Sequence, residues 1–136
     1  MNRNPSVRLF DVSGANWESE GGLAITTKAD LRRHLNKLAD REPGIVDLLS
    51  PEGVRLQLGL GGRYACAQLL PANNQPPYLV AEAREVTAGD DVEFLLGDTP
   101  TPVPPEHCIS VTEAMRIAEY FFENGGPDPT VEWKKV

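Results

Sequence analysis

The C-terminal stretch, residues 103–133, constrains the fold more than any other part of this sequence. Ser110 stands three residues before Glu113, and this S-x-x-E capping box marks the first turn of a helix. Apolar side chains then recur with the 3.6-residue period of a helix: Val111, Ala114, Met115, Ala118, Phe121 and Phe122. Gly125 follows this stripe, at the place where a left-handed residue ends many helices. The pattern predicts a capped amphipathic helix that packs its aromatic stripe against a sheet.

A short final strand is predicted after this helix. Pro127 and Pro129 prevent the helix from resuming. Residues 130–133 then alternate in polarity, which places Val131 and Trp133 on one face of a strand. A helix, a glycine turn and a strand are common in any α+β domain, so the pattern alone indicates a fold and no function.

The same stretch resembles the end of the first-numbered immunity-protein family of bacterial polymorphic toxin systems, whose founding partners are deaminase toxins. In that family a Val-Pro or similar loop precedes a helix with a small residue and a pair such as Phe-Phe. A glycine turn and Val-x-Trp follow. The matching residues here are Val103, Pro104, Ala114, Ala118, Phe121, Phe122, Gly125, Val131 and Trp133. Asp128 stands where the family has a proline, so the turn before the final strand is expected to differ.

Length and composition predict one globular domain that spans residues 1–136. The chain has 136 residues, and 40% of them are hydrophobic. No run approaches the eighteen apolar residues of a membrane span, and the N-terminus lacks the apolar core of a signal peptide. These features favour a cytoplasmic protein. Cys66 and Cys108 are too few for a disulfide framework, so both are expected to be free thiols.

The net charge of -7 is spread unevenly along the chain. Residues 1–75 carry nine Lys/Arg and eight Asp/Glu, whereas residues 76–136 carry four and twelve. This balance argues against binding to nucleic acid, whose phosphates require a cationic surface. An acidic half can attract a basic protein and speed its capture, although acidity also serves solubility alone.

The rest of the chain reads as one further helix and several strands. Thr27 caps the helix, with Asp30 three residues later, and the buried face holds Leu31, Leu35 and Leu38. Residues 23–25 suit either a short strand or the approach to this helix. Strands are predicted over residues 6–12, 45–49, 54–60, 63–70, 78–81 and 92–96. The proline-rich segment 98–105 suits an extended edge. The predicted class is α+β: a mostly antiparallel sheet with two principal helices packed on one face and a short C-terminal strand.

The residues with reactive side chains form no recognisable catalytic motif. The run Gly59–Gly62 lacks the Lys-Ser/Thr pair and the following helix of a phosphate loop, so a hairpin turn is favoured. The acidic cluster around residues 90–98 lacks the spacing of a calcium loop. The two histidines and two cysteines lack the spacing of a zinc site. We therefore expect no catalytic residues, no metal and no cofactor.

The resemblance implies a cytosolic inhibitor that performs no chemistry and binds the toxin domain encoded beside it, a deaminase or another toxin that acts on nucleic acid. Acidic side chains that could steer such a basic toxin are Glu82, Glu85, Asp90, Asp91, Glu93 and Asp98. The alternative is a small enzyme or ligand-binding domain whose site is assembled from scattered residues, namely His34, Tyr64, His107 and Cys108. The sequence leaves the oligomeric state open.

Overall fold

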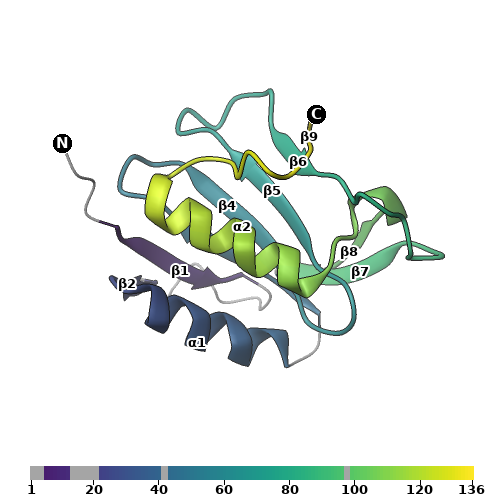
Figure 1. Cartoon of the computed structure of the whole chain (residues 1–136), viewed down its shortest axis with the longest axis horizontal. Coiled ribbons are helices and arrows are strands. Elements are labelled where there is room, and N and C mark those ends of the chain that lie inside the picture. The colour runs from purple at the N-terminus through teal and green to yellow at the C-terminus, as the bar shows by residue number, and fades with distance from the viewer. Residues whose placement is uncertain (1–4, 13–21, 41–42, 97–98) are drawn as a thin grey trace.

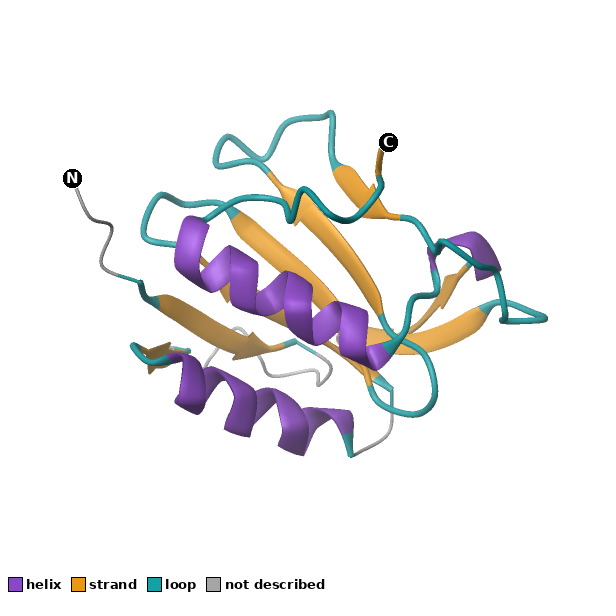
Figure 2. Ribbon diagram, viewed as in Figure 1, coloured by secondary structure: helices purple, strands orange, loops and turns teal. Residues whose placement is uncertain are grey.

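A nine-stranded sheet with two α-helices on one face makes up the computed structural model, which describes residues 5–12, 22–40, 43–96 and 99–136 (Figures 1 and 2). The helices are α1 (Lys28–Ala39) and α2 (Val111–Asn124), and a 3-10 helix, η2 (Pro105–His107), precedes α2. The strands are β1 (Val7–Asp11), β2 (Leu23–Ile25), β3 (Gly44–Leu49), β4 (Arg55–Leu60), β5 (Cys66–Leu70), β6 (Leu79–Ala81), β7 (Val92–Leu96), β8 (Thr99–Val103) and β9 (Trp133–Lys135).

The sheet is antiparallel along its main path, β2-β1-β3-β4-β5-β6-β9. The β7–β8 hairpin leaves this path and joins β3 through one parallel pair, Gly44 with Leu95. The predicted α+β class with a mostly antiparallel sheet is confirmed. Residues 23–25, which the sequence left open, form strand β2 at one edge.

The main core lies between the sheet and the two helices. On β4, Leu56, Leu58 and Leu60 alternate with half-buried or small residues and are almost completely buried. They meet Leu31 and Leu35 of α1 in one apolar cluster. The residues that α2 buries there are Ala114, Ile117, Ala118, Phe121 and Phe122. The predicted stripe is therefore confirmed, with Ala114, Ala118 and the two phenylalanines buried. The prediction omitted Ile117, and its members Val111 and Met115 are only half-buried at the margin of the cluster.

Local sequence signals set the ends of both helices. The Thr27 hydroxyl accepts a hydrogen bond from the backbone N–H of Asp30 at 3.1 Å, and Ser110 accepts one from Glu113 at the same distance. Gly125 ends α2 in the left-handed region, with φ of 76°. The predicted caps are thus confirmed at both N-termini and at the C-terminus of α2.

A second, smaller core lies on the other face of the sheet, under the β7–β8 hairpin. Its centre is Phe94, which is fully buried with Val12 and Ile45. A Cβ added at Gly59 would lie 2.8 Å from the Phe94 ring and 2.5 Å from the Cys66 sulfur. Glycine on β4 therefore makes room for the hairpin. Pro100 and Pro102 lie in β8, whose free edge needs no ladder donor.

The final strand begins later than predicted. Residues 130–133 were expected to form it, but β9 runs over Trp133–Lys135. The carboxylate of Asp128 accepts hydrogen bonds from the backbone N–H and the hydroxyl of Thr130, and the N–H of Val131 donates to the Asp128 carbonyl. These bonds hold Thr130 and Val131 in a turn, so the chain cannot join the ladder there. Val131 is nonetheless buried and Trp133 packs on the main core.

Candidate functional site

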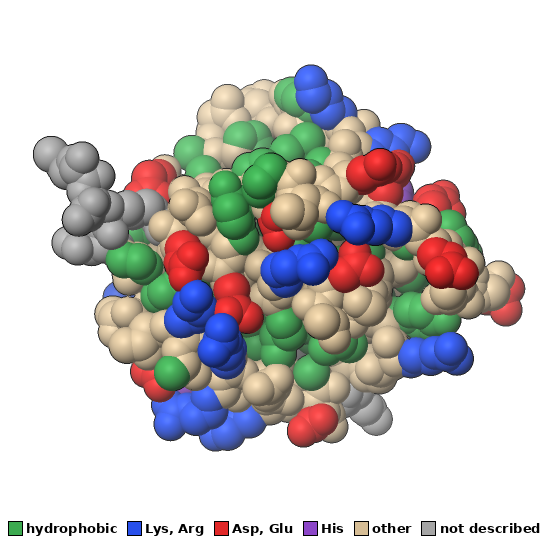
Figure 3. Space-filling model, viewed as in Figure 1, with side chains coloured by type: hydrophobic (Ala, Val, Ile, Leu, Met, Phe, Trp, Pro, Cys, Tyr) green, Lys and Arg blue, Asp and Glu red, His purple; other side chains and the backbone are tan. Residues whose placement is uncertain are grey.

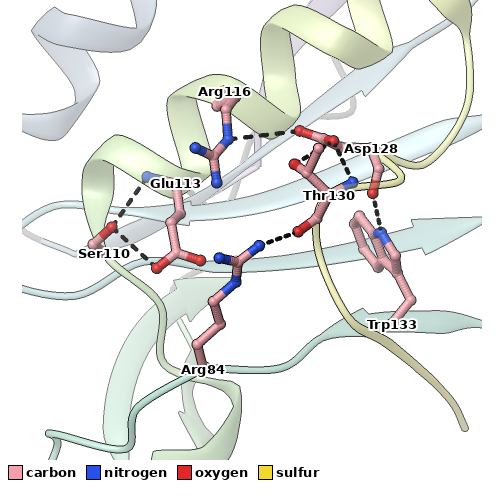
Figure 4. Close-up of polar contacts among 7 residues, drawn as sticks. All are labelled: Arg84, Ser110, Glu113, Arg116, Asp128, Thr130 and Trp133. Carbon is pink, nitrogen blue, oxygen red and sulfur yellow. Dashed lines mark hydrogen bonds and ion pairs between the residues drawn. The ribbon is translucent and has the colours of Figure 1, made fainter.

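The outer face of α2 and the two segments beside it form the candidate site, which we call the α2 face. The flanking segments are residues 82–87, which follow β6, and residues 126–133, which follow α2. Figure 3 shows acidic and basic side chains intermingled over this side of the molecule. Figure 4 shows that side chains from all three segments converge there.

Asp128 organises the turn that borders the α2 face. The residue is buried, and its Oδ1 atom accepts hydrogen bonds from the backbone N–H and the hydroxyl of Thr130 at 2.9 and 2.7 Å. The guanidinium of Arg116, on α2, lies 3.7 Å from the same carboxylate. The indole N–H of Trp133 donates to the Asp128 carbonyl at 2.9 Å (Figure 4). A buried carboxylate needs such donors, so these contacts fix the C-terminal segment against α2.

The acidic residues in the second half of α2 are paired with α1. Glu119 contacts Arg32 at 2.5 Å, and Glu123 contacts Lys28 at 2.5 Å. These exposed pairs contribute little stability each, but they occupy the charges that α2 would otherwise offer to a partner.

A groove of about 400 Å³ lies beside the first turn of α2, and we call it the Tyr64 groove. The isolated bridge between Ala65 and Ile109 holds two of its three segments together, because it joins the residues before β5 to the segment before α2. Its lining residues are Arg63, Tyr64, Ala83, Arg84, Glu85, Thr87, Cys108, Ile109, Ser110 and Glu113. The sequence did not indicate this groove, because the residues that line it come from three distant segments.

Two arginines of the Tyr64 groove have neutral partners. The guanidinium of Arg63 lies 5.4 Å from the centre of the Tyr64 ring, a cation–π contact. Arg84 donates a hydrogen bond to the backbone carbonyl of Thr130 (Figure 4). Glu113 itself accepts a long hydrogen bond, 3.4 Å, from the Ser110 hydroxyl.

The residues of the alternative ligand site are only partly brought together. Tyr64 and Cys108 line the same groove, and His107 precedes Cys108 in the chain. His34 lies on α1 and is not among the lining residues. The Nε2 atom of His107 is buried and lacks a hydrogen-bond partner within the described ranges. Among all the residues that the structure describes, no group of three or more His, Cys, Asp or Glu side chains could hold a metal ion.

Both thiols are free, and their surroundings disfavour the thiolate. Burial raises the pKa of Cys66 to about 12. Burial also raises the pKa of Cys108, and the negative charges of Asp91 and Glu106 add to this effect. The Cys108 sulfur lies 3.4 Å from the Pro104 carbonyl as a donor. A nucleophilic cysteine requires a lowered pKa, so neither thiol has the electrostatics of a catalytic one.

The predicted steering residues fall on the segment that links β6 to β7 and on β7 itself. Glu85 lines the Tyr64 groove, and the negative charge of Asp91 helps to raise the pKa of Cys108, another lining residue. Asp90 and Glu93 are exposed, and Glu82 is half-buried. None of these five carboxylates makes an ion pair with another described residue. Asp98 lies outside the described residues.

A separate polar pair lies on the opposite face of the sheet. Asp47 of β3 is buried and accepts a hydrogen bond from Arg55 of β4 at 2.7 Å. Burial raises the pKa of Asp47, and the effect exceeds the opposing effect of Arg55. Its Oδ1 atom has no partner among the described residues, and it is inaccessible to solvent. This pair links the side chains of the adjacent strands β3 and β4.

These features define a small α+β protein whose distinctive part is a surface, built by one helix and the turn that follows it. No described helix has the length and apolarity needed to cross a membrane. Comparison with protein families then identifies the chain more closely. It belongs to the Imm1 family of immunity proteins, whose family model, described as immunity protein Imm1, matches residues 19–135. That match includes both helices and all of the α2 face. No curated protein is similar enough in sequence to be matched to this chain.

Proposed function

We propose that this protein binds a toxin domain encoded beside its own gene and inhibits it in the cytosol of the cell that makes both. Its membership of the immunity-protein family over residues 19–135 carries this proposal. An inhibitor of this kind acts by occupying a surface of the toxin and performs no chemistry. The raised pKa values of both thiols disfavour catalysis by a cysteine nucleophile.

The target class that we propose is a deaminase or another toxin that acts on nucleic acid. Such a toxin needs cationic surface to hold phosphates. The -8 balance of residues 76–136 complements that surface, and most of these acidic residues are exposed. Charge complementarity favours this class of toxin over toxins whose substrates are cationic or apolar.

Binding is proposed to proceed in two stages. The unpaired carboxylates of Glu82, Glu85, Asp90, Asp91 and Glu93 attract and align the toxin as it approaches. Contacts that exclude water then supply most of the affinity. Because the second half of α2 uses its acidic groups to pair with α1, steering is assigned to the segment 82–93 and not to that helix.

The alternative is a ligand-binding domain that uses Tyr64 and Cys108, since both line one groove. Direct measurement separates the two functions. The neighbouring toxin domain is purified, and its activity on nucleic acid is titrated with this protein. Inhibition that is complete at a one-to-one ratio, with a stable complex on gel filtration, is expected. Full toxin activity in the presence of excess protein would exclude the proposed function.

A further inference from the structure

Most arginines of the described chain are already paired with carboxylates. Arg32, Arg33, Arg55 and Arg116 each lie within 4 Å of an acidic group. Arg8 donates to the backbone carbonyl of Gly22 and has a further interaction of its own. Two arginines, Arg63 and Arg84, make no ion pair with a carboxylate of the described residues. Both line the Tyr64 groove.

The contacts of these two arginines hold them in place without neutralising them. The Tyr64 ring contacts the guanidinium of Arg63 without accepting a hydrogen bond from it. All the N–H donors of Arg63 therefore remain available to a ligand. Arg84 uses a neutral backbone carbonyl, and its other donors stay available. Arginine and tyrosine are also the residue types most often responsible for affinity at protein interfaces.

Two acidic residues complete the groove, and they restrict what it can accept. Glu85 and Glu113 line the same space and make no ion pair within 4 Å in the described chain. A purely acidic ligand would be repelled by them, and a purely basic ligand would be repelled by the arginines. A segment that carries one acidic side chain beside a basic one satisfies all four groups.

We propose that the Tyr64 groove is where the toxin is anchored, by a segment whose carboxylate binds Arg63 and Arg84 and whose neighbouring cation faces Glu85 and Glu113. This inference rests on the proposed function and names the part of the surface that carries it. Planar guanidinium groups bind carboxylates in a bidentate manner, so the contact gives orientation as well as affinity. The exposed segment 82–93 accounts for the approach of the toxin, and the groove accounts for its retention.

The test measures association and dissociation of the purified neighbouring toxin domain with single variants of this protein. Arg63→Ala is the main variant, because the contact of Arg63 with the Tyr64 ring lies at the surface and we expect an unchanged melting temperature without it. We expect its Kd to rise about tenfold or more, chiefly through faster dissociation. Arg63→Lys keeps the charge but loses the planar fork, so an intermediate rise is expected. Arg33→Ala removes another exposed arginine that lies outside the groove and should bind within about twofold of the wild type.

Arg84 requires a second readout because it also holds the Thr130 carbonyl. The melting temperature of Arg84→Ala is measured beside its Kd, and Arg84→Lys serves as the variant that keeps the charge. Weaker binding by variants that melt like the wild type supports the inference. If wild-type protein binds and inhibits the toxin, but both Arg63 variants bind as tightly as the wild type, the groove is not the anchor and the proposed function stands. If the wild type itself does not bind, both proposals fall.

Discussion

The indole N–H of Trp133 lies 2.9 Å from the main-chain carbonyl of Asp128 and donates to it, so β9 is tied to the turn that ends at the α2 face. The Asp128 side chain holds the other half of that turn through Thr130. Asp128 thus uses its carboxylate for the turn and its carbonyl for both the turn, through the Val131 N–H, and the strand, through Trp133.

Removing the Asp128 carboxylate should loosen this turn. Asp128→Ala removes the buried acceptor of the Thr130 N–H and hydroxyl, and we expect the free energy of unfolding to fall by about 1–2 kcal/mol. Asp128→Asn keeps one acceptor oxygen and should lose less. Urea denaturation measures both, and Asp90→Ala, at an exposed position, should change stability by less than about 0.5 kcal/mol. A loss no larger for Asp128→Ala than for the exposed control would contradict this role.

The contact between Phe94 and Gly59 predicts an asymmetry between two glycines. Gly59→Ala forces a methyl group against the Phe94 ring and the Cys66 sulfur, so a loss of about 1–3 kcal/mol is expected. Gly89→Ala is the matched control, since a Cβ there meets no atom within 4 Å. It should be neutral or slightly stabilising. Thermal melts of the two variants compare them directly, and equal melting temperatures would refute the close packing.

The buried thiol of Cys66 predicts a loss of stability at alkaline pH. An unfolded cysteine ionises near pH 8.5. The folded one does so only at about 12. Between these values the unfolded state releases a proton that the folded state retains, so stability is full below the lower pKa and falls as pH rises toward the upper one. The unfolding free energy should therefore drop more between pH 8 and pH 10.5 in the wild type than in Cys66→Ala. Parallel curves for the two proteins would show that Cys66 does not contribute.

Acidic steering makes a kinetic prediction. Replacing Asp90, Asp91 and Glu93 with lysine should slow association with the toxin and leave dissociation nearly unchanged, because exposed charges act mainly on the approach. Neutralising them to Asn, Asn and Gln should give an intermediate rate. Added salt should slow the wild type more than the reversed variant. Binding kinetics at two ionic strengths provide the measurement, and an association rate insensitive to both salt and reversal would rule out steering.

Local sequence signals predicted the elements of this fold well, because their causes are local. The capping residues Thr27 and Ser110 and the left-handed Gly125 act within one helical turn, and all three were recognised. The later start of β9 was missed because Asp128 competes with the sheet for the backbone of Thr130, and polarity alternation does not register that competition.

The Tyr64 groove depends on contacts between distant parts of the chain and could not be predicted. Pairing of Ala65 with Ile109 brings Tyr64 to the segment before α2, and the hydrogen bond from the Ala83 N–H to the Glu106 carbonyl brings the Arg84 segment there; no local pattern encodes either contact. Of the predicted steering residues, Glu85 alone lines the groove. The two unpaired arginines were missed because pairing can be judged only when every carboxylate has a position in space.

The central claim is that this protein neutralises a toxin in the cell that makes it. In the direct test, the neighbouring toxin domain is expressed from an inducible promoter in cells that contain either this protein or an empty vector. A third strain contains this protein and expresses an inactivated toxin. We predict that cells with the toxin and the empty vector die, whereas cells with the toxin and this protein grow as well as those with the inactivated toxin. Equal death with and without this protein would contradict the claim.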